Sequence, residues 1–468
     1  MRNVWLLLLL ALVILIVAYF GGCFPCGCFG TCPPSSKGND ICADSTYKDS
    51  VYCRQIITQG PQSPAFKAKL DKFGFRKIDS CDCDADFALW ESASHVVVEL
   101  ITEPPQEKAG GKVGGVGGDI FCINIPLHFN RTNSIIGNSL VNRDNAGKQL
   151  NEGDTNIEPV QVAVVDSGVD SLVPSIENYF SHDNAPYNSG CGTYPQVSPL
   201  GLNMGDKMRG IKDINNHGTV VNTILADYSN IFSDYSWQSE RESKNIRLAI
   251  RNVRFTDGQS LNGSLFKAIC GMYYAIKKGA KVINVSWGFY ADGVPIILKP
   301  VLQYAQEKDV LIVAGVGNHH IDIDGSRSFW PAAFARDTMS YLDNPSKKIK
   351  NVLSVGGYKA SGTAHDFLTI SDSSNYGANS VSVYALGQDV LTVLAIPSGQ
   401  AALGSGTSFA TPFVTRTAAI LRGLKPRKSA SDIKQCVIDA AAQKVYPTSG
   451  LIGNIKVHNH ALALTRCN

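Results

Sequence analysis

Short apolar runs alternate with longer, helix-like stretches over the chain from about residue 155 onward. The runs are rich in Val, Ile and Leu and lack regular polar positions, which is typical of strands buried on both faces. Such strands, separated by helices, predict the α/β class, with a mostly parallel sheet and helices on both of its faces. The clearest runs are "QVAVV" at 161, "IRLAIRNVRF" at 246, "KVINVS" at 281, "VLIVAGV" at 310, "NVLSVGG" at 351 and "VSVYAL" at 381.

The expected sheet indicates where functional side chains should lie. Parallel sheets covered by helices bind their ligands outside the carboxyl ends of the strands. We therefore expect active residues directly after the apolar runs, within one large domain at residues 155–468.

A smaller unit precedes this domain at residues 51–106. It contains the strand-like "VYCRQIIT", the helix-like "SPAFKAKLDKFG" and the strand-like "FALWES" and "HVVVELI", a pattern that predicts a small α+β fold. Residues 107–154 follow as a hinge and linker, because "EKAGGKVGGVGGD" is rich in glycine. A phosphate-binding loop is the alternative, but no P-loop Lys-Ser/Thr pair follows these glycines.

The first 22 residues form a membrane-targeting segment. An unbroken apolar run extends from Val4 to Phe20, about 25 Å as a helix, and Arg2 is the only charge before it. Its length lies between a signal-peptide core and a full membrane span, so a cleaved signal, a retained anchor and a lipoprotein signal all stay open. We expect the chain beyond this segment to lie outside the cytoplasm.

Four cysteines follow in "GGCFPCGCFGTC", at the start of a polar stretch at 23–50 that is typical of a tether. Gly21 and Gly22 before Cys23 resemble a bacterial lipoprotein cleavage site, although Phe20 stands where an aliphatic residue is usual. The chain has 13 cysteines, and lipidation of Cys23 would leave an even number. Metal binding, palmitoylation and disulfides are the alternatives, and the sequence does not reveal any pairing.

Composition and charge narrow the class of partner. An apolar fraction of 44% with 43 glycines is typical of a globular protein, and 468 residues allow one large domain or two to three ordinary ones. The net charge of +3 is too small to indicate nucleic acid or an acidic substrate as partner.

A serine at the start of an apolar helix raises the question of nucleophilic catalysis. Ser408, in "GTSFATPFV", could simply cap that helix, which is the usual role of Ser at such a place. A nucleophile also needs a base and a group that orients the base. His217 opens a helix in "NNHGTVVNTI", and Asp166 ends the first strand in "VAVVDSGVD". The chain therefore offers a nucleophile, a base and an orienting carboxylate.

A fourth polar residue, Asn318, follows a buried strand and glycines in "LIVAGVGNHH". Its side-chain amide could donate a hydrogen bond to an oxyanion, together with the backbone N–H of Ser408 at the helix start. Taken alone, Asn318 would be interpreted as a turn residue after Gly. Its occurrence together with Asp166, His217 and Ser408 favours the oxyanion role.

The motifs around these residues resemble those of the subtilisin-like serine protease family (subtilases, peptidase S8). The resemblance covers about residues 155–445 and rests on "DSG" at Asp166, "HGT" at His217 and "GTSFATP" at Ser408. The order Asp, His, Ser is that of this family, whereas α/β-hydrolases run Ser, Asp, His. The resemblance implies a subtilisin-like fold. It also implies that Ser408 attacks the scissile carbonyl, His217 transfers the proton, Asp166 orients the imidazole and Asn318 binds the oxyanion.

The same resemblance suggests residues for substrate binding. Ser286, Trp287 and Gly288 in "NVSWG" look like the strand segment that holds the substrate backbone. Ala314 and Gly315 in "AGVG" look like the opposite wall of the primary specificity pocket. Ordinary strand and turn are the alternatives for both stretches.

The stretch "SFWPAAF" at 328–334 resembles an aromatic-Pro pair of the family through Trp330 and Pro331. This alignment places Phe329 at the floor of the primary pocket, where a phenyl ring would make the pocket shallow. We therefore expect a preference for small or medium apolar side chains before the cleaved bond. Packing of Phe329 into the core, away from substrate, is the alternative.

Two stretches depart from the family pattern. "HGTVVNTI" lacks the second His and the Gly common after the His motif, and "PFVTR" has Phe413 and Arg416 where His and Gly are frequent. These differences concern the packing of two helices and substrate preference rather than the reaction class.

A loop after Asn318 raises the question of a metal. "NHHIDID" offers His319, His320, Asp322 and Asp324 as conceivable ligands, but a solvated loop is favoured. The expected reaction requires no cofactor. Calcium sites occur in the family, and the sequence does not locate one.

The sequence as a whole predicts an exported, membrane-tethered or secreted serine endopeptidase that acts on protein or peptide substrates. The unit at 51–106 looks like the inhibitory propeptide of such proteases, with a stalk or adhesion module as the alternative. A protease-like binding or structural protein without turnover is the alternative for the whole chain. Retention of all four polar site residues argues against that alternative. The sequence indicates neither the natural substrate nor the oligomeric state.

Overall fold

The structure is a computed structural model. It describes residues 51–81, 83–93, 120–128, 133–140, 158–170, 197–198, 201–203, 212–213, 215–226, 246–256, 262–291, 294–325, 327–336, 348–361, 367–393, 400–445 and 454–467. The apolar segment, the first four cysteines and the strand predicted from "HVVVELI" lie outside these ranges. None of the helices within them combines the length and hydrophobicity that crossing a bilayer requires.

The chain folds into two compact units. The smaller unit holds a four-stranded sheet with one helix packed on it. Its sheet order is β2-β3-β1-β4. The fourth strand, β4, comes from within the range predicted to be a hinge. The elements are β1 (Gln55–Gln59), α2 (Pro64–Lys72), β2 (Phe75–Cys81), β3 (Asp84–Ser92) and β4 (Ile120–Ile123), preceded by a 3₁₀ turn at Val51–Arg54.

Helix α2 packs on one face of this small sheet. Ser63 caps the helix, because its hydroxyl accepts a 3.1 Å hydrogen bond from the Phe66 N–H. Phe66 and Leu70 lie one turn apart and pack with Ile56 and Phe75 of the sheet. The boundary predicted for this unit at residue 106 stays a prediction.

The larger unit is built on a mostly parallel sheet, as the apolar runs predict. Each of the six runs coincides with one of six adjacent parallel strands, and these strands lie in the order β10-β7-β12-β14-β16-β18. Their bounds are β7 (Val160–Asp166), β10 (Leu248–Arg254), β12 (Val282–Val285), β14 (Leu311–Gly315), β16 (Val352–Ser361) and β18 (Val383–Leu386). The chain order reverses at β7 and β12, which is where sheets of this kind bind ligands.

Shorter strands extend this sheet and flank it. The sheet is extended by β8 (Val197–Ser198), β9 (Gly201–Asn203), β17 (Phe367–Ile370), β21 (Ala442–Val445) and β22 (Asn454–Val457). Two separate small sheets pair β5 (Pro126–His128) with β11 (Asn262–Ser264), and β13 (Phe289–Ala291) with β15 (Ser328–Trp330). A third small sheet has β20 (Gln400–Gly404) in the middle, between β19 (Val390–Val393) and β6 (Asn133–Leu140).

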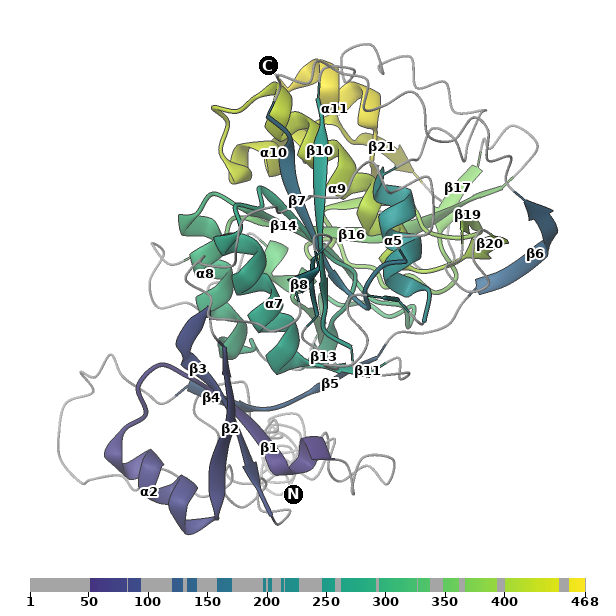
Figure 1. Cartoon of the computed structure of the whole chain (residues 1–468). Helices are drawn as coiled ribbons and strands as arrows, with labels where there is room; N and C mark the ends of the chain where they lie inside the picture. Colours follow the sequence, from purple (N-terminus) through teal and green to yellow (C-terminus); the bar gives the residue numbers. More distant parts are fainter. Residues whose placement is uncertain are drawn as a thin grey trace, which may run out of the picture. The chain divides into compact units, whose positions relative to one another are not determined.

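Helices cover both faces of the large sheet (Figure 1). Alternate strand residues point to opposite faces, so that Val162 and Val164 join one core cluster while Ala163 and Val165 do not. One face carries α5 (His217–Ala226), α9 (Thr407–Leu424), α10 (Ala430–Ala440) and α11 (His460–Arg466), and the other carries α7 (Leu265–Lys277) and α8 (Lys299–Glu307). Two 3₁₀ turns lie at Ile296–Leu298 and Ala332–Ala335.

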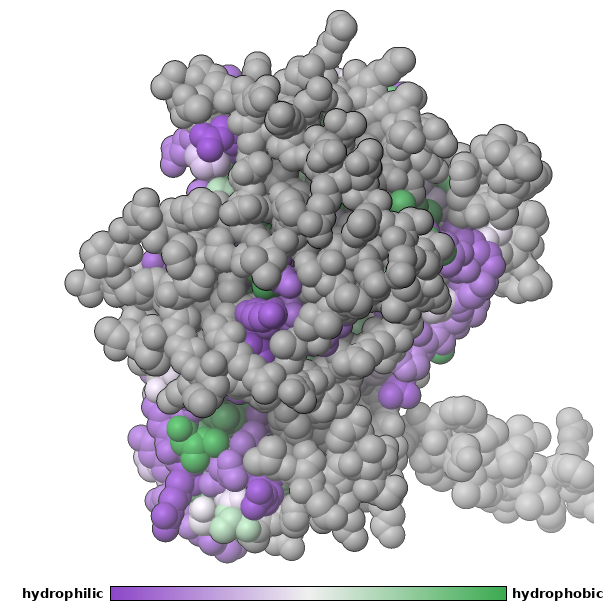
Figure 2. Space-filling model, turned by 45° about the vertical axis from the view of Figure 1, so that its right-hand side comes forward, coloured by the Kyte–Doolittle hydropathy of each residue, from purple (hydrophilic) through white to green (hydrophobic). Residues whose placement is uncertain are grey.

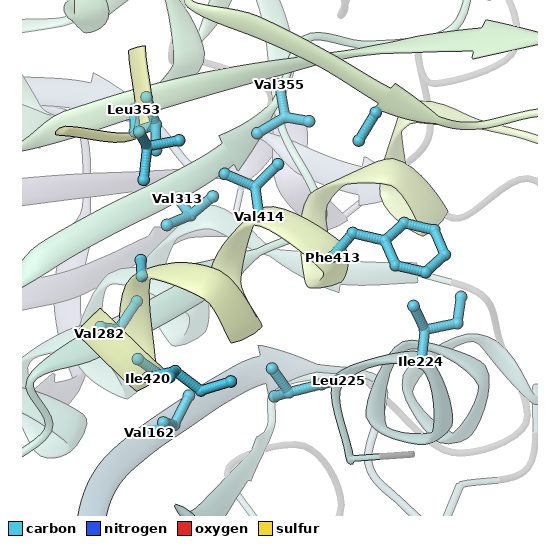
Figure 3. Packing of buried hydrophobic residues seen from close by; sticks show 14 of the residues in the cluster. Val162, Ile224, Leu225, Val282, Val313, Leu353, Val355, Phe413, Val414 and Ile420 are labelled. Atoms are coloured by element: carbon cyan, nitrogen blue, oxygen red, sulfur yellow. The ribbon is translucent and has the colours of Figure 1, made fainter. Parts of the chain in front are cut away.

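The two unusual residues of "PFVTR" strengthen the contact between α5 and α9. In Figure 3, Phe413 of α9 points toward Ile224 of α5, and both side chains are buried in the main core cluster. Arg416 donates hydrogen bonds of 2.9 and 2.6 Å to the carbonyls of Leu225 and Ala226. Both carbonyls belong to the last two described residues of α5, so Arg416 joins α9 to that part of the helix.

The described surface in Figure 2 is mainly hydrophilic, with small hydrophobic areas. Among the described residues, Ile78 is the one large hydrophobic side chain that is exposed, at 50%. A single exposed side chain of this kind needs no partner to explain it.

The C-terminal segment is fastened to α9 and α10. A disulfide joins Cys436 of α10 to Cys467, and the Thr417 hydroxyl of α9 bonds to His458 Nε2 at 2.9 Å and to His460 Nδ1 at 2.7 Å. Cys53, Cys83 and Cys122 also form disulfides, whereas Cys81 and Cys270 are buried and form none.

Burial lowers the pKa of His458 to about 4 from an ordinary value of 6.5. The unfolded chain therefore takes up this proton at higher pH than the folded chain. Stability from neutral His458 is complete above pH 6.5 and is lost as pH falls toward 4. Between pH 7.5 and 5.0, we expect wild type to lose about 2 kcal/mol more unfolding free energy than His458→Gln.

Urea unfolding at both pH values measures this difference. His320→Gln, at an exposed histidine, is the matched control substitution. An identical pH dependence in wild type and His458→Gln would contradict the assignment.

Candidate active site

Asp166 and His217 form a buried pair at the carboxyl end of β7. Asp166 Oδ1 accepts a hydrogen bond from the Ser167 N–H at 2.7 Å and contacts His217 Nδ1 at 2.8 Å. His217 is the first residue of α5, and the side chains of Asp166 and His217 are only 1% and 7% exposed. Because Nδ1 is held by the carboxylate, Nε2 is the ring nitrogen left for proton transfer.

Glycine is required where the two segments of this pair meet. A Cβ atom at Gly218 would lie 2.1 Å from the carbonyl oxygen of Gly168, which no real side chain could tolerate. The glycines of "DSG" and "HGT" therefore allow the backbone after Asp166 to touch the start of α5. This close approach brings the carboxylate within hydrogen-bond reach of the imidazole.

Ser408 is the second residue of α9, and Pro412 explains the geometry around it. Proline has no N–H, so the Ser408 carbonyl lacks its helical partner four residues on. The Ser286 hydroxyl donates to that carbonyl at 2.9 Å instead, and the Ser408 hydroxyl donates to the Ser286 carbonyl at 3.1 Å. Two reciprocal bonds therefore fix the start of α9 to the segment after β12.

His217 and the start of α9 are neighbours. The His217 ring lies against the ring of Phe409, with centroids 5.8 Å apart. Phe409 directly follows Ser408, so the structure brings all three predicted reactive residues to one edge of the sheet. Within the described residues, the Ser408 hydroxyl bonds to Ser286 and not to His217.

Asn318 is oriented by the same helix start. Its Oδ1 accepts hydrogen bonds from the Thr407 N–H at 2.8 Å and from the Thr407 hydroxyl at 3.0 Å. With the oxygen committed in this way, the amide nitrogen of Asn318 is the end left free, and no described residue accepts from it. A half-buried N–H donor therefore stands beside the residue next to Ser408.

Of the other residues predicted to bind substrate, Gly288 lies directly against the ring of Phe329. Phe329 is 9% exposed, and a Cβ atom at Gly288 or Gly317 would lie 2.5 or 2.9 Å from its ring. The ring therefore lies directly against the backbone after β12 and the backbone after β14. Trp287 is buried and packs edge-on to Phe255, with ring centroids 5.7 Å apart.

Ala314 and Gly315 lie deeper than the ring of Phe329. Ala314 is fully buried in β14, and a Cβ at Gly315 would lie 3.0 Å from the Thr411 hydroxyl oxygen of α9. Gly317, rather than these two residues, is the glycine in contact with Phe329.

The loop after Asn318 is organised by hydrogen bonds. His319 Nδ1 bonds to the Tyr290 hydroxyl at 2.7 Å, and the Asp324 carboxylate accepts the N–H groups of Asn379 and Ser380 at 2.8 Å. Burial raises the pKa of Tyr290, with Asn375 and Arg327 acting in the opposite direction. Among the described residues, no group of three His, Cys, Asp or Glu side chains could hold a metal ion.

Sequence reasoning missed several contacts that position this site. Thr407 orients Asn318, the Ser286 hydroxyl holds the Ser408 carbonyl, and Asp213 and Ser167 bond to the start of α5. Thr407 was detectable as the second hydroxyl in "GTSFATP". Asp213 lies in a polar turn, "KDINNHGT", where an acidic residue is normally solvated.

A family model described as the subtilase family matches residues 158–458. The chain belongs to the subtilase family. This confirms the resemblance drawn from the three motifs. The large parallel sheet with helices on both faces is accordingly a subtilisin-like α/β fold.

Curated relatives are similar to this subtilase over its larger part. The cell wall-associated protease of Bacillus subtilis (strain 168) is 29% identical over 336 residues, which are 69% of this chain and 31% of that protein. Alkaline protease 1 of Aspergillus clavatus is 26% identical over 286 residues, which are 59% of this chain and 62% of that protein. The matched region spans less than two thirds of the length of either relative.

Solved structures agree on the fold. The epidermin leader peptide processing serine protease of Staphylococcus aureus has a TM-score of 0.57 at 16% identity, covering 88% of this chain and 99% of that chain. Fervidolysin of Fervidobacterium pennivorans, a keratinolytic enzyme related to subtilisin, has a TM-score of 0.55 at 16% identity, covering 88% of this chain and 61% of that chain.

Proposed function

We propose that this subtilase is a serine endopeptidase that cleaves peptide bonds through Ser408, His217 and Asp166. The buried 2.8 Å contact between Asp166 and His217, at the edge where α9 begins, is the observation that carries the proposal. A neutral imidazole held in this way presents Nε2 as a base. Ser408 directly precedes Phe409, whose ring packs on His217.

In the proposed reaction, the Ser408 hydroxyl leaves the Ser286 carbonyl and turns toward His217. Ser408 Oγ attacks the carbonyl carbon of the substrate while His217 accepts the hydroxyl proton. The imidazolium then gives that proton to the leaving nitrogen as the C–N bond breaks. Water, activated by His217, hydrolyses the acyl-enzyme and restores Ser408. Asp166 stabilises the imidazolium in both halves of the cycle.

The negative oxygen formed in each half needs hydrogen-bond donors. The Asn318 amide nitrogen is one, because Thr407 holds its oxygen on the opposite side. The Ser408 N–H is the other, because the first N–H groups of a helix have no helical acceptor. These donors are in place before substrate arrives, so little reorganisation is needed in the transition state.

Export and membrane tethering belong to the same proposal. The apolar run from Val4 to Phe20 supports targeting, and the disulfide between Cys436 and Cys467 supports an oxidising compartment. A location at the cell envelope fits the name of the Bacillus subtilis relative, a cell wall-associated protease. The unit at 51–106 would act as an inhibitory propeptide.

Substrate choice follows from Phe329. Its ring lies against Gly288 and Gly317, on the backbone segments proposed to hold substrate. The Phe329 ring therefore occupies space between those two segments. We propose that small or medium apolar side chains are accepted before the cleaved bond, and that Phe, Tyr or Arg are used poorly.

The first prediction from this function concerns the nucleophile. Ser408→Ala should abolish labelling by a fluorophosphonate, because no other residue is activated by the Asp166 and His217 pair. The fold should be retained, as measured by circular dichroism. Thr465→Ala, which removes an exposed hydroxyl that has no proposed role in the reaction, is the matched control and should still label. Persistent labelling of Ser408→Ala, or no labelling of wild type, would refute the assignment.

Asn318→Ala should lower kcat by about 10²- to 10³-fold with little change in KM, because an oxyanion donor acts mainly in the transition state. Steady-state kinetics on a peptide selected from a library measures both constants. The exposed Asn379→Ala serves as the control amide and should keep wild-type kcat. A wild-type kcat in Asn318→Ala would mean that Asn318 is only a turn residue.

Phe329→Gly should open the pocket and allow cleavage after large aromatic side chains. We expect the relative kcat/KM for Phe against Ala at that position to rise by roughly ten- to two-hundred-fold, the usual effect of steric exclusion in an apolar pocket. Peptide-library profiling measures the ratio, and Phe329→Leu should give an intermediate value. A wild type that already prefers aromatic residues, with a profile unchanged in Phe329→Gly, would exclude this role.

A further inference from the structure

Asp213 is a buried acidic residue that the proposed reaction does not use. Its side chain is fully buried, and both carboxylate oxygens are saturated with donors. Oδ1 accepts from the Ser167 hydroxyl, the Asn215 N–H and the Asn216 N–H, each at 3.1 Å, and Oδ2 accepts from the Thr219 N–H at 2.7 Å and the Thr219 hydroxyl at 2.8 Å.

These partners lie on both sides of His217 in the sequence. Asn215 and Asn216 precede the histidine and Thr219 follows it, so one carboxylate holds the whole turn that begins α5. The first N–H groups of a helix have no helical acceptors, and Asp213 supplies the acceptor for the one at Thr219. The position of the His217 backbone therefore depends on Asp213.

The same carboxylate also reaches the segment that carries Asp166. The Ser167 hydroxyl donates to Asp213 Oδ1 and accepts the Gly218 N–H at 2.8 Å. Ser167 directly follows Asp166, and Gly218 directly follows His217. Asp213 and Ser167 therefore connect the two chain segments at positions adjacent to both members of the catalytic pair.

We propose that Asp213 is a positioning residue for the Asp166 and His217 pair, through the turn it holds and through its negative charge. The proposal rests on the proposed protease function. A negative charge beside the pair stabilises the imidazolium that forms when His217 accepts the Ser408 proton. The polar contacts hold the ring where Nδ1 meets Asp166.

The charge of Asp213 is supported by its partners. The pKa of this carboxyl is raised overall, because burial, together with the charge of Asp166, outweighs the lowering by the hydrogen bonds from Thr219 and from the Asn215 N–H. All five partners are donors, which is the pattern that an ionised carboxylate requires. The other titratable groups around it are His217 on α5, Asp166 and the buried Asp170 after β7, and the exposed Lys212 before it.

Two variants separate geometry from charge. Asp213→Asn keeps the size of the side chain but removes the charge and sets an amide N–H₂ against donors. Ser167→Ala keeps the charge and removes only the bridge between the two segments. The readout is the second-order rate constant of fluorophosphonate labelling of the full chain as a function of pH, which requires no knowledge of the substrate.

Asp213→Asn should label roughly 10²-fold more slowly than wild type, the size expected when a catalytic group is misplaced. The acid limb of its pH profile should move to lower pH, because a negative charge near the Asp166 and His217 pair has been removed. Ser167→Ala should label more slowly with its acid limb unmoved. Asp309→Asn is the control for a merely structural carboxylate, since Asp309 accepts the Ala430 N–H at the start of α10.

Asp309→Asn should lose thermal stability but keep the wild-type labelling rate and acid limb. If Asp213→Asn behaves in the same way as Asp309→Asn, the positioning role is overturned while the protease function stands. If wild type does not label at all, the protease function and this inference fail together. If Asp213→Asn does not fold, Ser167→Ala decides, because a wild-type labelling rate in that variant would also overturn the proposal.

Discussion

The contact between Asp166 and His217 is the constraint on which the rest of the site depends. A buried carboxylate is costly unless donors surround it, and Asp166 Oδ1 has the Ser167 N–H and the His217 ring. The contact requires the end of β7 to touch the first turn of α5, which is sterically open only because Gly218 has no side chain. Small neighbours in the two motifs are thus consequences of one close approach.

The proposed nucleophile, Ser408, depends on a second constraint, the packing of α9 on α5. Phe413 faces Ile224 (Figure 3), and Arg416 donates hydrogen bonds to the carbonyls of Leu225 and Ala226, so the two helices are joined by both apolar and polar contacts. Pro412 leaves the Ser408 carbonyl free for the Ser286 hydroxyl, which fastens α9 to the strand segment after β12. The proposed base, His217, and the proposed nucleophile, Ser408, therefore begin two different helices that pack together.

The central sheet could be predicted from the sequence because strands buried on both faces are uninterrupted apolar runs. Every run became a parallel strand of the larger unit. Strand β4 was not predicted, since its four residues lie beyond a glycine-rich stretch and gain their order from pairing with β1. Short strands such as β5 and β11 were likewise not predicted, because their pairing partners are distant in sequence.

The proposed reactive residues stand out in the sequence because their chemistry demands open space around them, and small neighbours leave a pattern. Positioning residues leave no such pattern. Asp213 lies in a polar turn that composition alone assigns to solvent, and it becomes buried only when the turn closes over it and supplies five donors. Burying an acidic side chain in this way is costly unless donors meet its oxygens, and the five hydrogen bonds provide them. Because those donors lie on the residues directly around His217 and next to Asp166, the same bonds that stabilise the carboxylate also order the backbone of both segments.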